Sequence, residues 1–216
     1  MKKALSLLLL TGILLSLLGI CGCAGRRAPK LESIYDRVVQ LIEASYELNE
    51  IFYGEGLPYY DRNLPVYESI YNDYMTEQYT RDYNIVNRDA KYTSVEEIKL
   101  AAEQVYTKSL LEDTVYPGVF DGLITTDLGS TSHVASARYL QGNDDLYILI
   151  EKETDPAAPV PLVYDYASMK IIKPSNATRV LISIDAWEYT NPSRIIQEQI
   201  TLAYVDGEWY LDSLTV

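Results

Sequence analysis

The sequence predicts an α+β fold in which N-terminal helices pack on an antiparallel sheet. Apolar residues recur at three- and four-residue steps in much of the chain before residue 116 and alternate at every second residue after about residue 137. Turn-forming residues separate the alternating runs, as they do between antiparallel strands. We therefore expect a helical part over 31–116 and a sheet part over 137–216, within a single domain that spans 31–216.

The first predicted helix runs from Leu31 to about Tyr53. The breakers in GEGLP, residues 54–58, should end it. Its apolar face is formed by residues at helical spacing, which are Leu31, Ile34, Tyr35, Val38, Leu41, Ile42, Ser45, Leu48 and Phe52.

A second, shorter helix is expected after Pro65, because proline fits the first turn of a helix. Tyr67, Ile70, Tyr71 and Tyr74 would share one face of it.

A third helix is predicted to begin at Val95. Ser94 and Glu97 have the spacing of a capping box, in which the serine side chain bonds the first free backbone N–H groups. The apolar periodicity continues to Leu110, and Pro117 and Gly118 should close the segment.

The strands are expected in alternating runs. ARYLQ and DLYILIE flank the turn residues 142–144, and the later runs are PLVYDYASMKII, TRVLISIDAWEY, IIQEQITLAYV and EWYLDSL. Asp206 and Gly207 lie between the last two runs, and this dipeptide accepts the positive φ angles of a type I′ turn. The last two runs should therefore form a hairpin.

The N-terminus has the layout of a secretory signal. Lys2 and Lys3 precede an uncharged apolar stretch over 4–20, and the small residue Gly22 follows it. Basic residues flank both ends of the stretch, so a retained membrane span would have little orientational support. Cleavage is the expected outcome.

Ile20, Cys21, Gly22 and Cys23 resemble the lipobox of bacterial lipoproteins, in which an aliphatic residue, a variable residue and a small residue precede the lipidated cysteine. The resemblance implies a signal peptide over 1–22, acylation of Cys23, and a tether over 23–30. Several acyl chains on one cysteine give stable anchoring. The chain would then be held on the extracytoplasmic face of a bacterial cell membrane.

Two other interpretations of the cysteines are weaker. A disulfide between Cys21 and Cys23 would close a strained ring across one residue. A zinc site would lack ligands, because His133 is the only histidine.

The three helices and the hairpin ITLAYVDGEWYLDSL resemble the cone fold of nuclear-transport-factor-2-like (cystatin-like) domains over about residues 31–216. The resemblance implies a curved, cone-like antiparallel sheet. Enzymes of this fold such as ketosteroid isomerases use an aspartate base with tyrosine donors, which brings Asp165 between Tyr164 and Tyr166 into consideration. Alternation along a strand places Asp165 on the face opposite both tyrosines, which argues against a shared site.

The composition is acidic and rich in tyrosine. Removal of residues 1–22 takes away two lysines and no acid, which leaves 16 basic and 31 acidic residues and a formal charge of −15. A domain this acidic repels phosphate backbones, so we expect no nucleic-acid partner. The chain holds 20 tyrosines but only two Phe and two Trp. Tyrosine suits half-buried packing as well as contacts with sugars or peptides.

The sequence contains no convincing catalytic or metal motif. Ser130 stands three residues before His133, but no G-x-S-x-G motif surrounds it. Asp144 and Asp145 have a turn composition and lack the ligand spacing of a calcium loop. We expect no catalytic residue, no metal and no cofactor.

These observations favour a membrane-anchored extracytoplasmic lipoprotein whose domain is a non-enzymatic binding or interaction module of the cell envelope. Its partner would be an envelope protein, a peptide or a wall glycan. Two alternatives stay open: a small-molecule isomerase or hydrolase that uses a cone-fold pocket, and an inhibitor of a cell-wall enzyme. The candidate contacts are Tyr59, Tyr60, Tyr67, Tyr71 and Tyr74.

Overall fold

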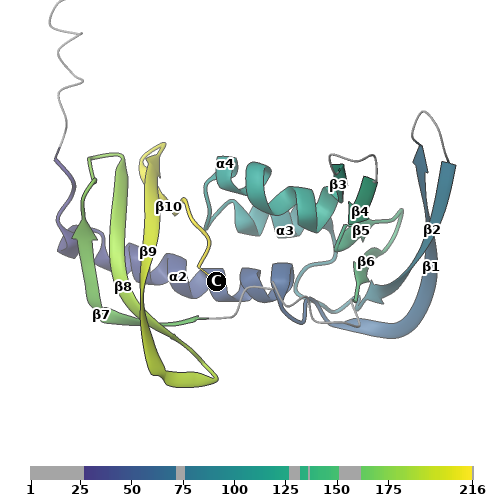
Figure 1. Ribbon diagram of the computed structural model, residues 1–216, viewed down its shortest axis with the longest axis horizontal. Coiled ribbons are helices and arrows are strands. Elements are labelled where there is room, and N and C mark those ends of the chain that lie inside the picture. Colours follow the sequence, from purple (N-terminus) through teal and green to yellow (C-terminus); the bar gives the residue numbers. More distant parts are fainter. Residues whose placement is uncertain (1–26, 72–75, 127–131, 136, 151–161, 216) are drawn as a thin grey trace, which may run out of the picture.

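The computed structural model describes residues 27–71, 76–126, 132–135, 137–150 and 162–215. Helices and antiparallel strands form an α+β structure (Figure 1). The helical elements are η2 (Leu31–Ser33), α2 (Tyr35–Tyr53), α3 (Val95–Ala102), α4 (Lys108–Leu110), η3 (Leu111–Val115) and η4 (Pro117–Asp121). The strands are β1 (Tyr59–Tyr71), β2 (Thr76–Val86), β3 (Leu123–Thr126), β4 (Ser132–Ala135), β5 (Tyr139–Gln141), β6 (Leu146–Leu149), β7 (Leu162–Ile172), β8 (Arg179–Glu188), β9 (Asn191–Val205) and β10 (Glu208–Leu211).

The end and the apolar face of the first helix agree with the prediction, whereas its α-helical part begins at Tyr35 and the 3-10 turn η2 precedes it. α2 ends at Tyr53, and the backbone N–H of Gly54 caps it by donating to the carbonyl groups of Asn49 and Glu50. The predicted apolar face is buried at Val38, Leu41, Ile42, Ser45, Leu48 and Phe52. α2 runs along the length of the molecule, with the β7–β10 sheet near one end and β1, β2, β5 and β6 near the other (Figure 1).

The helix predicted after Pro65 is wrong, because this segment is part of β1. β1 pairs with β2 in an antiparallel hairpin whose register runs from Tyr59 opposite Val86 to Tyr71 opposite Thr76. β1 is the edge strand of the sheet β1-β2-β6-β5. An edge strand tolerates proline, which cannot donate a ladder hydrogen bond. The predicted helical part over 31–116 therefore contains a β-hairpin.

The third helix begins as predicted and ends early. Ser94 Oγ accepts a hydrogen bond from the backbone N–H of Glu97 at 3.2 Å. α3 stops at Ala102, and helical structure resumes at α4. Pro117 does not close the segment, because the helical stretch continues through it from η3 into η4, where the helix turns are wider than in an α-helix. The helical stretch ends instead at Gly122, whose φ is 74°.

The expected single sheet over 137–216 divides between two sheets. β5 and β6 join β1 and β2, whereas β7, β8, β9 and β10 form a separate antiparallel sheet in the order β10-β9-β8-β7. The turn between β9 and β10 is confirmed, because Asp206 has a φ of 49° and Gly207 a φ of 96°. The pairing of β7 with β8 shifts between Asp165 and Lys170. β7 turns a corner in Figure 1, as irregular pairing of this kind bends a strand.

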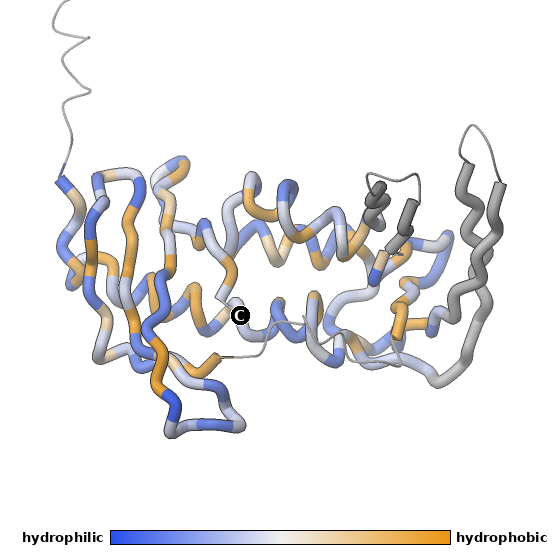
Figure 2. Tube along the Cα trace, viewed as in Figure 1, coloured by the Kyte–Doolittle hydropathy of each residue, from blue (hydrophilic) through white to orange (hydrophobic). Residues whose placement is uncertain are grey.

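One apolar cluster connects the helices with both four-stranded sheets. It includes Ile42 of α2, Ile98 of α3, Ile148 of β6 and Ile182 of β8, all of which are fully buried. Figure 2 shows apolar residues recurring along these elements among hydrophilic ones. Burial of this apolar surface is the main favourable term that holds the two sheets to α2.

Candidate functional site

The five tyrosines predicted as contacts have different positions in the structure. Tyr59 and Tyr60 begin β1 and are exposed, at 37% and 44%. Tyr67 and Tyr71 lie further along the same strand, and Tyr74 lies outside the described residues. The predicted helical tyrosine face is therefore wrong, and the structure brings four of the five positions onto one edge strand.

Several other tyrosines belong to the core. Tyr83, Tyr106 and Tyr139 are among the largest fully buried side chains. Tyr139 Oη donates to the carbonyl of Ile51 at 3.1 Å and accepts from the N–H of Leu57 at 3.0 Å. Burial raises the pKa of Tyr139. Some of the tyrosines therefore pack in the core, whereas others lie on the surface.

Exposed apolar side chains that the sequence did not single out lie at the two ends of β9. Tyr189 is 82% exposed and Ile195 67% exposed, at the hairpin that joins β8 to β9. This hairpin projects from the rest of the molecule and carries a short apolar segment (Figure 2). At the other end, the ring of Tyr204 lies 5.0 Å from that of Trp209. The sequence could have indicated this hairpin, because the apolar pair Ile195 and Ile196 follows closely after turn residues.

An open groove of about 510 Å³ runs along α3. Lys99 in this groove places its Nζ 4.6 Å from the ring centroid of Tyr116 and 5.0 Å from that of Phe120. A cation over aromatic faces is attracted by the ring quadrupole. The charge of Lys99 therefore interacts with two aromatic rings of the same chain. The groove has both polar and apolar lining residues. Its lining residues are Ser94, Val95, Glu96, Lys99, Leu100, Glu103 and Gln141.

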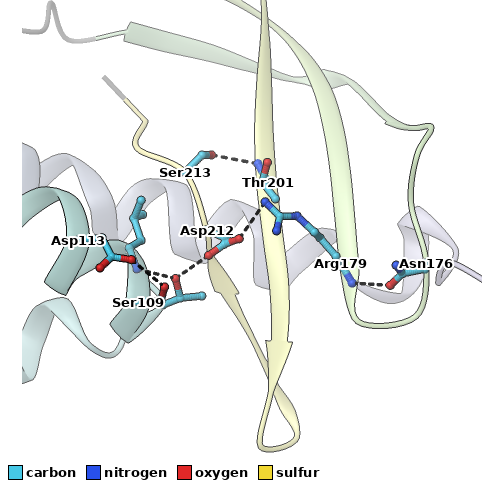
Figure 3. A network of polar contacts seen from close by, with 9 residues as sticks. Ser109, Asp113, Asn176, Arg179, Thr201, Asp212 and Ser213 are labelled. Atoms are coloured by element: carbon cyan, nitrogen blue, oxygen red, sulfur yellow. Dashed lines mark hydrogen bonds and ion pairs between the residues drawn. The ribbon is translucent and has the colours of Figure 1, made fainter. Parts of the chain in front are cut away.

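A polar network holds the C-terminal segment against β8, β9 and α4 (Figure 3). Asp212 Oδ1 accepts from Thr107 Oγ1 at 2.7 Å, and its Oδ2 lies 3.2 Å from Nη2 of Arg179. Ser213 Oγ accepts from the N–H of Thr201 at 3.0 Å. Each of these polar atoms bonds a structural partner, so the network positions the segment.

Two further contacts extend this network at its ends. Ser109 Oγ donates to Asp113 Oδ2 at 3.3 Å, one turn further along the helical stretch. Asn176 Oδ1 accepts from the N–H of Arg179 at 2.8 Å, in the turn before β8 (Figure 3). Both contacts are exposed and join residues close in the chain, so they stabilise the helical stretch after Thr107 and the turn before β8 locally.

The residues considered for chemistry do not come together. Ser130 lies outside the described residues, and His133 lies on β4. Asp165 is exposed and Tyr164 is buried, in agreement with their predicted opposite faces. Within the described parts of the chain, no group of three or more His, Cys, Asp or Glu side chains could hold a metal ion.

Neither a protein-family model nor a curated protein matches the sequence. Among the residues that the structure covers, no helix combines the length and the apolar character that a membrane crossing requires. Residues 1–26, which include the predicted signal and Cys23, lie outside them.

Proposed function

We propose that this chain is an extracytoplasmic bacterial lipoprotein, anchored through acylated Cys23, whose folded part is a non-enzymatic binding module of the cell envelope. The anchor is supported by the order of the N-terminal residues: two lysines, an apolar stretch, and the lipobox-like Ile20 to Cys23. The observation that carries the binding role is the exposed pair Tyr59 and Tyr60 at the start of an edge strand.

The two tyrosines are suited to a contact surface. Consecutive side chains of a strand point to opposite faces of a sheet, so Tyr59 and Tyr60 offer aromatic area on both sides of the edge. Tyrosine supplies large apolar area with a polar tip and is enriched among residues that dominate binding energy. The partner would be an envelope protein, a peptide or a wall glycan. Tyr67, Tyr71 and Tyr74 are proposed as further partner contacts on the basis of the sequence.

The anchor is tested with Cys23→Ser. We expect the native protein to fractionate with membranes and its N-terminal fragment to carry the mass of an acylated cysteine. The Cys23→Ser protein should keep its leader and lose the acyl mass. An unmodified Cys23 thiol in material purified from the native host would refute the anchor.

The binding role is tested with the double variant Tyr59→Ser and Tyr60→Ser. Crosslinking in intact cells should capture a partner with the native chain and lose it with this variant. The matched control replaces Tyr189 and Tyr204 by Ser, because these are also exposed tyrosines but lie in the β8–β9 turn and on β9, away from β1. Equal capture by the native chain and both variants would refute the role of the pair.

The cone-like curvature stays a proposal, together with the functions attached to it. The bend in β7 supports curvature of its sheet. A pocket enclosed by such a sheet would support the isomerase or hydrolase alternative, since ligand sites are concave and mostly apolar. Inhibition of a cell-wall enzyme would use the same exposed surfaces as the binding module.

A further inference from the structure

β9 has one edge that is only partly covered. β8 pairs with one side of β9 as far as Ile196 in a regular register, whereas β10 pairs with the other side only at Leu202–Val205. Within the described residues, no strand pairs with the outer edge of β9 before Leu202. An uncovered strand edge presents backbone donors and acceptors in a row, which is a template for another strand.

The C-terminal segment shows which backbone groups point to this edge. The N–H of Asp212 donates to the carbonyl of Thr201 at 2.7 Å, and the N–H of Thr201 donates to Ser213 Oγ at 3.0 Å. Both backbone groups of Thr201 therefore point away from β8. Since the direction alternates along a regularly paired strand, Gln199 and Gln197 also present their N–H and C=O groups at the outer edge. The pairing proposed below continues this alternation to Ile195, which lies where the register with β8 shifts. The C-terminal segment contacts the edge at Thr201, and Gln199 and Gln197 before it are exposed residues.

We propose that two copies of this chain pair through the outer edges of their β9 strands, antiparallel and about a two-fold axis at Ile196. In this register Ile196 faces Ile196 of the second copy. Arg194 faces Glu198 of the second copy, and the symmetry repeats this ion pair. A two-fold interface uses the same patch on both subunits, and opposite charges directly across antiparallel strands are stabilising.

The charges select this register over its neighbours. Residues with outward backbone groups must face one another, so the axis can shift only by a whole residue. An axis at Gln197 would place Arg194 opposite Ile200, and an axis at Ile195 would place Glu198 opposite Pro192. Of these three axes, only the axis at Ile196 places Arg194 of one copy opposite Glu198 of the other.

Arg194 and Ile195 are exposed, whereas Ile196 and Glu198 are half-buried. Arg194 is 69% exposed, and its present contact with Glu188 is long, at 3.9 Å. Exposed ion pairs of this kind contribute little, so Arg194 can exchange partners at small cost. Ile195, which is 67% exposed, would be covered by the added strand. The β8–β9 hairpin projects from the rest of the molecule (Figure 1).

The pairing is independent of the lipid anchor and of Tyr59 and Tyr60, and it is tested by charge reversal in the full chain. Sedimentation equilibrium in density-matched detergent should show a native dimer. Arg194→Glu alone and Glu198→Arg alone each place like charges opposite one another and should weaken the dimer at least roughly tenfold. The double reversal should restore it, and a mixture of the two single variants should form a mixed dimer.

Matched controls separate the register from the overall charge. Lys170→Glu on β7 and Glu208→Arg on β10 change the net charge by the same amounts at exposed positions outside the proposed interface. They should leave the dimer unchanged. A monomeric native chain, a dimer indifferent to both reversals, or a double reversal that restores nothing would overturn the proposal.

A second test does not depend on charge. Facing residues that are not hydrogen-bonded lie about 4.5 Å apart between Cα atoms, within the range that a disulfide spans. Ile196→Cys should therefore form a disulfide-linked dimer on mild oxidation, beyond any seen with the native chain. Tyr189→Cys, placed outside the paired edge, should not. Equal crosslinking of the two variants would contradict the axis at Ile196.

Discussion

At the scale of single residues, Thr215 lies at the centre of a buried polar cluster. Its Oγ1 lies 2.6 Å from Ser45 Oγ and accepts from Asn49 Nδ2 at 3.0 Å. Tyr106 Oη donates to Asn49 Oδ1 at 2.9 Å. All four residues of the cluster are buried, and Thr215 is 1% exposed. The cluster ties the C-terminal segment to α2, because buried polar groups are costly unless each finds a partner.

We expect Thr215→Val to lower the free energy of unfolding by about 2 kcal/mol, because Asn49 and Ser45 lose a partner while the volume is kept. Urea denaturation followed by tryptophan fluorescence measures the change. Thr215→Ser keeps the hydroxyl and should lose less. A Thr215→Val protein as stable as the native chain would mean that water or a rearrangement satisfies the cluster.

At the scale of elements, the start of α3 follows from hydrogen bonds among neighbouring residues. Ser94 caps the helix as its spacing with Glu97 predicts. In a capping box the glutamate side chain accepts from the backbone N–H of the N-cap residue, here Ser94. Glu97 Oε2 instead accepts from the N–H of Thr93, one residue earlier, at 2.7 Å. This hydrogen bond lowers the pKa of Glu97. The start of α3 is thus determined within a few residues of sequence.

We expect Ser94→Ala to cost about 1 kcal/mol of unfolding free energy, because the N–H of Glu97 loses its side-chain acceptor. Thermal and urea denaturation both measure this loss. Ser109→Ala is the matched control, since its exposed bond to Asp113 contributes little. Equal stabilities of the two variants would show that solvent replaces the cap.

At the scale of the whole molecule, the phenol groups that lie in the common core or pack against it make the free energy of unfolding depend on pH in the alkaline range. Burial raises the pKa of Tyr53 from 10.0 to about 12. Burial also raises the pKa values of Tyr106, Tyr139 and Tyr164. Below pH 10 these groups are protonated in both the folded and the unfolded states. Above it the unfolded state ionises first, so it binds fewer protons and gains stability relative to the fold.

The free energy of unfolding should therefore fall between about pH 10 and about pH 12. Each fully shifted tyrosine contributes roughly 1.4 kcal/mol per pH unit within this window. Urea midpoints measured across the window, with tyrosinate absorbance recorded in parallel, check the slope. Tyr53→Phe removes one titrating group and should reduce it. A midpoint that stays constant up to about pH 12 would contradict the burial of these phenols.

The features that follow from short stretches of sequence were predicted correctly. The spacing of apolar residues defined α2, the Ser94 cap located the start of α3, and Asp206 with Gly207 located the last hairpin turn. Each depends on interactions among residues close in the chain. Tyr59 and Tyr60 were also selected from the sequence, and their exposure is a property of the fold.

The errors concern contacts between distant segments. The segment after Pro65 has helical spacing over a few residues, but it is a strand because β2 pairs with it and β6 in turn pairs with β2. The division of the C-terminal strands between two sheets depends on the same pairing. Alternation predicts that a strand exists and carries no information about which neighbour it joins.

By itself the sequence determined the acidic charge, the α+β class, the long first helix and the local caps and turns, because these depend on composition and on neighbours within a few residues. Only the tertiary structure decided the two-sheet arrangement, the edge position of Tyr59 and Tyr60, and the open edge of β9. These depend on long-range pairing and on the C-terminal segment, which bonds β9 at Thr201 and, among the described residues, leaves the earlier part of that edge without a paired strand.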